Sequence, residues 1–383
     1  MSELTDPVAL TQTLIRCPSV TPADEGALAV LEHVLGRLGF RCHRLRFEEP
    51  GTAPVENLFA RMGRDAPNFA FAGHTDVVPP GDPGSWRVDP FGGVIEGGQL
   101  YGRGAVDMKG AIGAFVAATA RFLAEHRPAG SISFLITGDE EGPAINGTRK
   151  LIGWLKEQGQ RLDACVVGEP TNPARLGQMI KIGRRGSLTG WLTVPGVQGH
   201  AAYPERADNP IPRLLAMLAA LTDEPLDGGS EFFQASELVI TSVDVGNQVS
   251  NVIPGQAQAT FNIRFGDRHS AKSLDGWLRR RLEAVGGRYE LRTETSGEPF
   301  VTRPGPFSEL LESLIERELG VAPELSTSGG TSDARFIKNA CPVVEFGLVG
   351  ATIHQIDERV DLADLEALTR IYQALITSYV RPA

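Results

Sequence analysis

The sequence of 383 residues lacks the features that define several classes of protein. No apolar stretch reaches the roughly 20 residues that span a bilayer, and the N-terminal MSELTDPVAL has neither the basic start nor the apolar centre of a signal peptide. There is no long basic run, and the formal net charge of −10 disfavours a nucleic-acid-binding face. We therefore expect a cytoplasmic protein that binds neither membranes nor nucleic acids.

Cysteine is scarce, and its spacing forms no known motif. The four cysteines are Cys17, Cys42, Cys165 and Cys341, with no CxxC among them. We expect all four to be reduced packing residues, as is usual in the cytosol. No GxSxG follows an expected strand, so a serine hydrolase is disfavoured as well.

Hydrophobic residues make up 42% of the chain, which is enough for a large core divided between two domains. In the first 180 residues, helices and strands alternate, a pattern typical of a parallel sheet with right-handed crossovers. We expect helices at about 6–15 and 24–38, strands at 57–62 and 69–73, and a long helix after the DMKG motif at 107–110.

The pattern changes between residues 181 and 297. Here the expected order is strand, helix, strand, strand, helix, strand, which is the ferredoxin-like unit. The chain then returns to α/β, with a helix at about 306–319, a strand at 343–346 and a helix at 362–378. We therefore expect an α/β fold, in which a mostly parallel-sheet domain of residues 1–180 and 298–383 carries an inserted ferredoxin-like βαββαβ (α+β) domain at 181–297.

Residues that can bind metal follow three of the apolar runs in the first domain. His74 follows FAFAG, Glu140 follows ISFLIT, and Glu169 follows ACVVG. Such runs read as buried parallel strands, and open α/β sheets bind their ligands at the carboxyl ends of the strands. Each motif alone is weak evidence, but buried carboxylates are costly unless a cation compensates them. We therefore expect these side chains to meet at one sheet edge.

The candidate ligands suit two metal ions better than one. They are two imidazoles and several carboxylates, at His74, Asp107, Glu140, Glu141, Glu169 and His354. Mixed imidazole and carboxylate ligands favour Zn²⁺, with Co²⁺ or Mn²⁺ as possible substitutes. Asp76 lies two residues from His74 and can accept the second imidazole N–H. One of the adjacent glutamates can bind metal while the other accepts a proton, but spacing does not decide which.

Four motifs resemble the M20 metallopeptidase-like amidohydrolases over essentially the whole chain. They are HTDVVP (74–79), GRGAVDMKG (102–110), GDEEG (138–142) and GEPT (168–171). The resemblance implies His74, Asp107 and Glu169 on one Zn²⁺, and Asp107, Glu141 and His354 on the other, with Asp107 bridging. It implies Glu140 as general acid and base, Asp76 as the partner of His74, and a cis peptide between Asp107 and Met108.

Further segments resemble the same family more specifically, among them KIGRRGS (181–187), QGHAAYP (198–204), SNVIPG (250–255) and SGGTSDARF (328–336). The resemblance implies a homodimer formed through residues 181–297, in which His200 enters the neighbouring subunit's site and stabilises the oxyanion. It also implies a small anionic acyl-amino-acid substrate, surrounded by Arg184, Tyr203, Asn251, Arg264, Gly330 and Thr331. IHQIDERV (353–360) departs further from the family pattern than the other segments do.

The reaction that the resemblance implies is hydrolysis of N-succinyl-LL-2,6-diaminopimelate to LL-2,6-diaminopimelate and succinate, in bacterial lysine and diaminopimelate biosynthesis. Two alternatives share the same metal ligands, namely a related deacylase acting on acetylornithine and a dipeptidase. A metal-stiffened binding protein without catalysis is disfavoured, because its sequence would lack Glu140 or Asp76.

Overall fold

The computed structural model describes residues 6–380. These residues form two compact units. The first comprises the chain up to Ile182, Thr302–Ser326, and the chain from Ser332 onward. The second comprises Gly183–Val301 and Thr327–Thr331.

The first unit contains an eight-stranded mixed sheet. Its strands, in spatial order, are β1 (Arg41–Phe47), β2 (Val55–Met62), β6 (Ser131–Thr137), β3 (Asn68–His74), β7 (Ala164–Val167), β18 (Val343–Glu345), β8 (Met179–Lys181) and β17 (Glu324–Ser326). The centre is parallel, because β3 pairs in parallel with β6 and β7, and β7 with β18. The pairs β1–β2, β2–β6 and β18–β8 are antiparallel. This confirms the expected mostly parallel sheet, while β1 is an edge strand that we did not predict.

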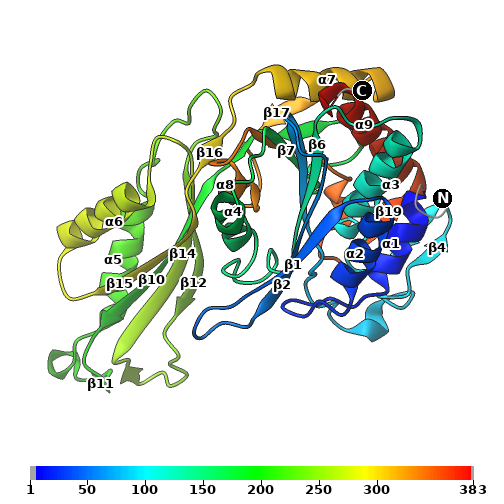
Figure 1. The fold of residues 1–383 in the computed structure, drawn as a ribbon. Helices are drawn as coiled ribbons and strands as arrows, with labels where there is room; N and C mark the ends of the chain where they lie inside the picture. Colours follow the sequence, from blue (N-terminus) through cyan, green and yellow to red (C-terminus); the bar gives the residue numbers. More distant parts are fainter. Residues whose placement is uncertain (1–5, 381–383) are drawn as a thin grey trace. The chain divides into compact units, whose positions relative to one another are not determined.

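Helices cover both faces of this sheet. They are α1 (Pro7–Ile15), α2 (Ala27–Arg37), α3 (Lys109–Glu125), α4 (Thr148–Glu157), α7 (Pro306–Leu319), α8 (Ala334–Ile337) and α9 (Leu362–Val380). Figure 1 shows α1, α2, α3 and α9 on one side of the sheet and α4 and α8 on the other. A small separate sheet joins β19 (Arg359–Asp361), β5 (Gln99–Tyr101) and β4 (Val94–Glu96). None of the helices in residues 6–380 meets the length and hydropathy needed to span a membrane.

Aromatic packing fixes α3 and α9 against the sheet. The Phe115 ring on α3 stacks on Phe71 of β3, with centroids 4.5 Å apart. It also packs in T-shaped pairs with Phe134 of β6 and Tyr372 of α9, with centroids 5.2 and 5.3 Å apart. All four side chains are fully buried. The helix α3, which begins two residues after Asp107, is therefore held firmly against the sheet.

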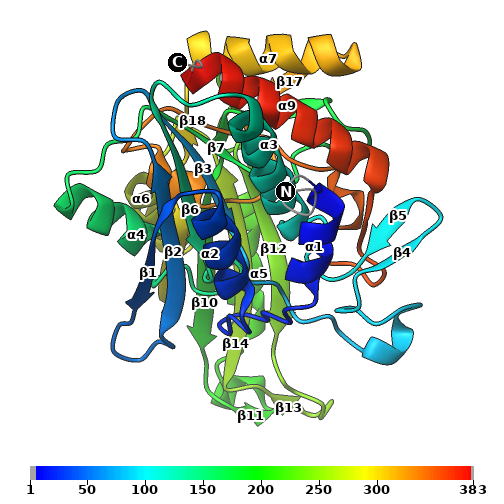
Figure 2. The same ribbon diagram turned by 45° about the vertical axis from the view of Figure 1, so that its right-hand side comes forward.

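The second unit has the ferredoxin-like topology. Its elements run β10 (Gly186–Pro195), α5 (Pro210–Thr222), β12 (Glu237–Asp244), β14 (Gln256–Phe265), α6 (Ala271–Val285) and β15 (Glu290–Gly297). The strands pair antiparallel in the order β12–β14–β10–β15, and α5 and α6 pack on one face of this sheet, as Figure 1 shows and the turned view of Figure 2 continues. The expected βαββαβ fold is thus confirmed. Two short ribbons complete the unit: β9 (Gly183–Arg184) with β16 (Phe300–Val301), and β11 (Gly199–His200) with β13 (Val252–Ile253).

Candidate active site

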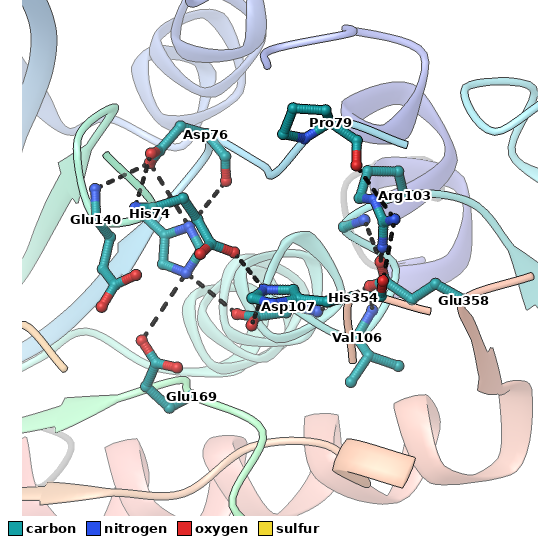
Figure 3. Close-up of polar contacts among 12 residues, drawn as sticks. His74, Asp76, Pro79, Arg103, Val106, Asp107, Glu140, Glu169, His354 and Glu358 are labelled. Carbon is teal, nitrogen blue, oxygen red and sulfur yellow. Dashed lines mark hydrogen bonds and ion pairs between the residues drawn. The ribbon is translucent and has the colours of Figure 1, made fainter. Parts of the chain in front are cut away.

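The first unit brings the predicted ligands together at the carboxyl edge of its sheet. His74 is the last residue of β3, while Glu140 and Glu169 lie in the loops after β6 and β7. Asp107 lies two residues before α3, and His354 follows the short 3-10 helix η4 (Gly350–Thr352). Figure 3 shows the side chains of these residues converging from separate segments of the chain.

Asp107 lies between the two imidazoles. Its Oδ1 is 3.2 Å from Nε2 of His74, and its Oδ2 is 3.4 Å from Nε2 of His354. Each carboxylate oxygen thus faces a different histidine, which is the arrangement of a bridging ligand. The Asp107–Met108 peptide is cis, as the family resemblance implied.

Glutamates complete the cluster on either side. Glu169 Oε1 lies 3.8 Å from Nε2 of His74, and Glu141 Oε1 lies 2.8 Å from Nε2 of His354. Candidate ligand atoms of His74, Asp107 and Glu141 all lie within 4.8 Å of one another, and so do those of His74, Glu140 and Glu169. Tetrahedral ligands bound at about 2.0–2.2 Å from zinc lie about 3.3–3.6 Å apart. The observed spacing therefore fits a metal centre.

The buried polar atoms also fit a cation. Glu169 is 9% exposed, and its Oε1 is buried without a hydrogen-bond partner among residues 6–380. A buried carboxylate oxygen without a partner is costly. Since nitrogen and oxygen donors of this kind suit zinc, cobalt or manganese, the residues present can hold such ions.

Asp76 connects His74 to the loop after β6. Nδ1 of His74 lies 2.9 Å from the backbone oxygen of Asp76, but 3.6 Å from its carboxylate Oδ1. The nearest partner is therefore the carbonyl rather than the carboxylate that we expected. The carboxylate instead accepts the backbone N–H groups of Glu140 at 3.3 Å and Glu141 at 3.0 Å. These two bonds hold the loop that carries both glutamates, which explains why the carboxylate is not the nearest partner of the imidazole.

Burial and mutual repulsion perturb the carboxyl groups. Burial raises the pKa of Glu140 well above its usual value, and the charges of Asp333, Asp107 and Glu141 raise it further against the opposing effect of His74. Burial also raises the pKa of Glu169, with Asp107 and Glu140 adding to the effect.

The pKa shifts of Asp107 and His354, in contrast, favour the charged forms of both groups. Burial would raise the pKa of Asp107, but hydrogen bonds with His354 and His74 outweigh it and lower that pKa. Hydrogen bonds with Asp107 and Glu141 raise the pKa of His354 to about 10. The cluster therefore attracts positive charge strongly, as a site for divalent cations must.

Sequence reasoning missed four buried charged residues around this cluster. They are Arg103, Asp139, Asp333 and Glu358. The carboxylate of Asp139 accepts three backbone N–H groups of its own loop, from Ala144, Ile145 and Asn146. All four residues lie inside motifs singled out above, so the signal was present. What the sequence did not reveal was the partner of each.

The second unit contains all six predicted substrate contacts and His200, in two separate groups. In the first, Arg184 is buried and its Nη1 donates to the backbone oxygen of Gly330 at 3.1 Å, with Thr331 next in the chain. Arg264 lies opposite Ser187 at the start of β10. Burial lowers the pKa of Arg264, and the charge of Arg185 adds to this.

The second group lies around the β11–β13 ribbon. The rings of His200 and Tyr203 lie 5.7 Å apart, and the backbone oxygen of Asn251 accepts the N–H of Ala201 at 2.8 Å. The two groups flank opposite ends of β10, whose 10 residues span about 30 Å when extended. One copy of the second unit therefore does not bring all of these residues around one small molecule.

Comparisons with known proteins agree with this architecture. Residues 70–378 match Peptidase family M20/M25/M40. The chain is 61% identical over 372 residues to the succinyl-diaminopimelate desuccinylase of Rhodospirillum centenum, covering 97% of this chain and 96% of that protein. It is 57% identical over 386 residues to the desuccinylase of Nitrobacter hamburgensis, covering 98% and 99%.

Solved structures show the same fold at lower identity. An M20 family metallo-carboxypeptidase from Sulfolobus solfataricus superposes with a TM-score of 0.79 at 16% identity, covering 97% of this chain and 99% of the other. A dinuclear metal-binding M20 peptidase from Bacillus subtilis gives a TM-score of 0.71 at 16% identity, covering 98% of each chain. With the family match over most of its length and these close relatives, the chain belongs to the M20/M25/M40 family of metallopeptidase-like hydrolases.

Proposed function

We propose that this protein is a metal-dependent amide hydrolase that cleaves N-succinyl-LL-2,6-diaminopimelate to LL-2,6-diaminopimelate and succinate. The observation that carries the proposal is identity of 56–61% over nearly the full length with proteins named succinyl-diaminopimelate desuccinylase. The clustered histidines and carboxylates supply a metal centre suited to amide hydrolysis.

We assign two Zn²⁺ ions to the cluster, with Co²⁺ or Mn²⁺ as possible substitutes. His74, Asp107 and Glu169 would hold one ion, and Asp107, Glu141 and His354 the other. The distances between Asp107 and both imidazoles support the bridging assignment. When bound, such ions polarise an amide carbonyl and lower the pKa of a water molecule.

Glu140 is the group that moves the proton. Its carboxyl lies close to His74 and Glu169, and burial raises its pKa, which makes it a stronger base than an exposed glutamate. It takes a proton from the water molecule as the water oxygen attacks the amide carbon. It then gives that proton to the amide nitrogen as the carbon–nitrogen bond breaks. Succinate and the free amine are the products.

The second unit would recognise the carboxylates of the substrate. Arg184 and Arg264 can bind carboxylates through their guanidinium forks, next to Gly330 and Thr331. His200, Tyr203 and Asn251 lie at the other end of β10, so a single copy does not gather all of these residues. This separation supports a homodimer formed through residues 181–297, in which His200 serves the site of the neighbouring subunit and stabilises the oxyanion.

A hydrolysis assay tests the substrate assignment. The purified protein is incubated with succinyl-diaminopimelate or with acetylornithine, and its metal content is measured in the same sample. We expect much higher kcat/KM for the succinylated substrate. Preference for acetylornithine or for a dipeptide, in metal-replete protein, would contradict the substrate while leaving the metal-dependent chemistry intact.

A further inference from the structure

A buried ion pair lies behind the metal ligands. Nη1 of Arg103 is 2.7 Å from Oε2 of Glu358, and the two residues are 2% and 0% exposed. Burying two charges is costly unless further hydrogen bonds satisfy them. Glu358 therefore requires partners beyond Arg103, and the loop that carries Asp107 supplies them.

The carboxylate of Glu358 holds the backbone on which Asp107 sits. Its Oε2 accepts the N–H of Gly104 at 3.0 Å. Its Oε1 accepts the N–H of Val106 at 2.9 Å and that of Asp107 itself at 3.2 Å. Figure 3 shows the carboxylate of Glu358 between Arg103 and Val106. These three backbone hydrogen bonds to one buried carboxylate fix the backbone at Asp107, and therefore the direction of its side chain.

Arg103 extends the same contact to two other ligand-bearing segments. Its Nη2 lies 3.4 Å from the backbone oxygens of Pro79 and His354. Its guanidinium also lies 5.3 Å from the centre of the Trp86 ring. Pro79 is the last residue of the motif that begins with His74. The ion pair therefore contacts the segments that carry His74, Asp107 and His354.

We propose that Glu358 and Arg103 are positioning residues that hold Asp107 and His354 in the geometry needed to share one divalent ion, and so set the affinity for that ion. The inference rests on the proposed metal-dependent function. The pair acts through backbone groups and supplies no ligand atom of its own. Outer partners of metal ligands typically account for about 10–100-fold in metal affinity.

The test is Glu358→Gln in the full-length protein. Glutamine keeps the shape of the side chain but removes the charge and one acceptor, and its amide N–H₂ then faces donor groups. Metal-free protein is titrated with Co²⁺, followed by visible absorption and calorimetry. We expect the binding step that His354→Ala abolishes to weaken about 10–100-fold in Glu358→Gln, with far-ultraviolet circular dichroism unchanged.

Glu366→Gln is the matched control. It breaks another Arg–Glu pair of the same unit, in which Glu366 on α9 accepts from both terminal nitrogens of Arg121 at 2.7 and 2.8 Å. Arg121 lies on α3, the helix that follows Asp107, but toward its other end. We expect Glu366→Gln to bind Co²⁺ with the affinity of the unmodified protein.

The outcomes separate the two claims. Unmodified protein that binds no divalent ion refutes the metal-dependent function. Unmodified protein that binds two ions, with unchanged Co²⁺ affinity in folded Glu358→Gln, overturns the positioning role alone, even if the melting temperature falls. If Glu358→Gln does not fold, Arg103→Lys decides the matter. Lysine keeps the positive charge but lacks the planar guanidinium group, so Co²⁺ affinity should fall about tenfold. An unchanged affinity overturns the proposal.

Discussion

Glu140→Gln should remove most of the turnover while leaving the metal centre occupied. Glutamine has nearly the same shape but cannot take up the proton that hydrolysis releases from water. General acid and base catalysis contributes about 10²–10⁴-fold, which corresponds to about 2.7–5.4 kcal/mol of the activation free energy. We therefore expect kcat to fall by at least about a hundredfold.

The structure explains why the ions should remain. The loop is held through the backbone N–H of Glu140, which donates to Asp76 at 3.3 Å and does not depend on the side chain. However, the Glu140 carboxyl also lies within 4.8 Å of candidate ligand atoms of His74 and Glu169. A ligand role is thus the competing hypothesis. The adjacent Glu141→Gln is the control, and as the variant of an assigned ligand it should lose metal.

The assay measures succinate release and metal content by mass spectrometry on the same preparations. Glu140→Gln protein that retains both ions but loses turnover supports the assignment. Loss of metal in Glu140→Gln, with retention in Glu141→Gln, would exchange the two roles. Metal-replete Glu140→Gln protein with kcat within about tenfold of the original, well below the usual contribution, would refute Glu140 as the base.

Three further results are expected. Arg184→Lys should lower kcat/KM about tenfold to a hundredfold through a higher KM. The guanidinium group that would bind a substrate carboxylate is lost, which weakens binding by about 1.5–3 kcal/mol. Unchanged KM in steady-state kinetics would exclude this contact. Asp139→Ala should lower the free energy of unfolding of the first unit by about 3 kcal/mol, because three backbone N–H groups lose a charged acceptor. Urea denaturation measures this loss. An unfolding free energy that is unchanged within error would show that water replaces the carboxylate. Burial raises the pKa of Cys165 and raises that of Cys341 to about 12, so a thiol reagent at pH 8 should modify these two only after denaturation, and rapid labelling of either in native protein would contradict their burial.

Much of the fold follows from the sequence, because periodicity is a local signal. The strand before His74 and the helix after Met108 were both predicted, since each buries a continuous set of apolar side chains. Strand β1 (Arg41–Phe47) was not, because its sequence RCHRLRF is rich in charge. It lies at the sheet edge and pairs with β2. Strands pair through their backbone groups, so the pairing leaves no hydrophobic periodicity in the sequence.

The candidate ligands could also be predicted from the sequence, because each follows an apolar strand or lies in a compact motif. The direction of each carboxylate was not. Asp76 gives its carboxylate to the loop of Glu140 and Glu141, and its backbone oxygen to His74. Both choices depend on where β3 and β6 end relative to one another, which is a property of the assembled sheet.

The sequence by itself therefore determined the kinds of element, the ligand types and the family, because these depend on residues near one another along the chain. Only the tertiary structure decided which groups meet. Arg103 and Glu358 lie 255 residues apart, and no local pattern links them. Their contact exists because the folded core brings the two loops together, and the burial that follows makes the pairing of their charges necessary.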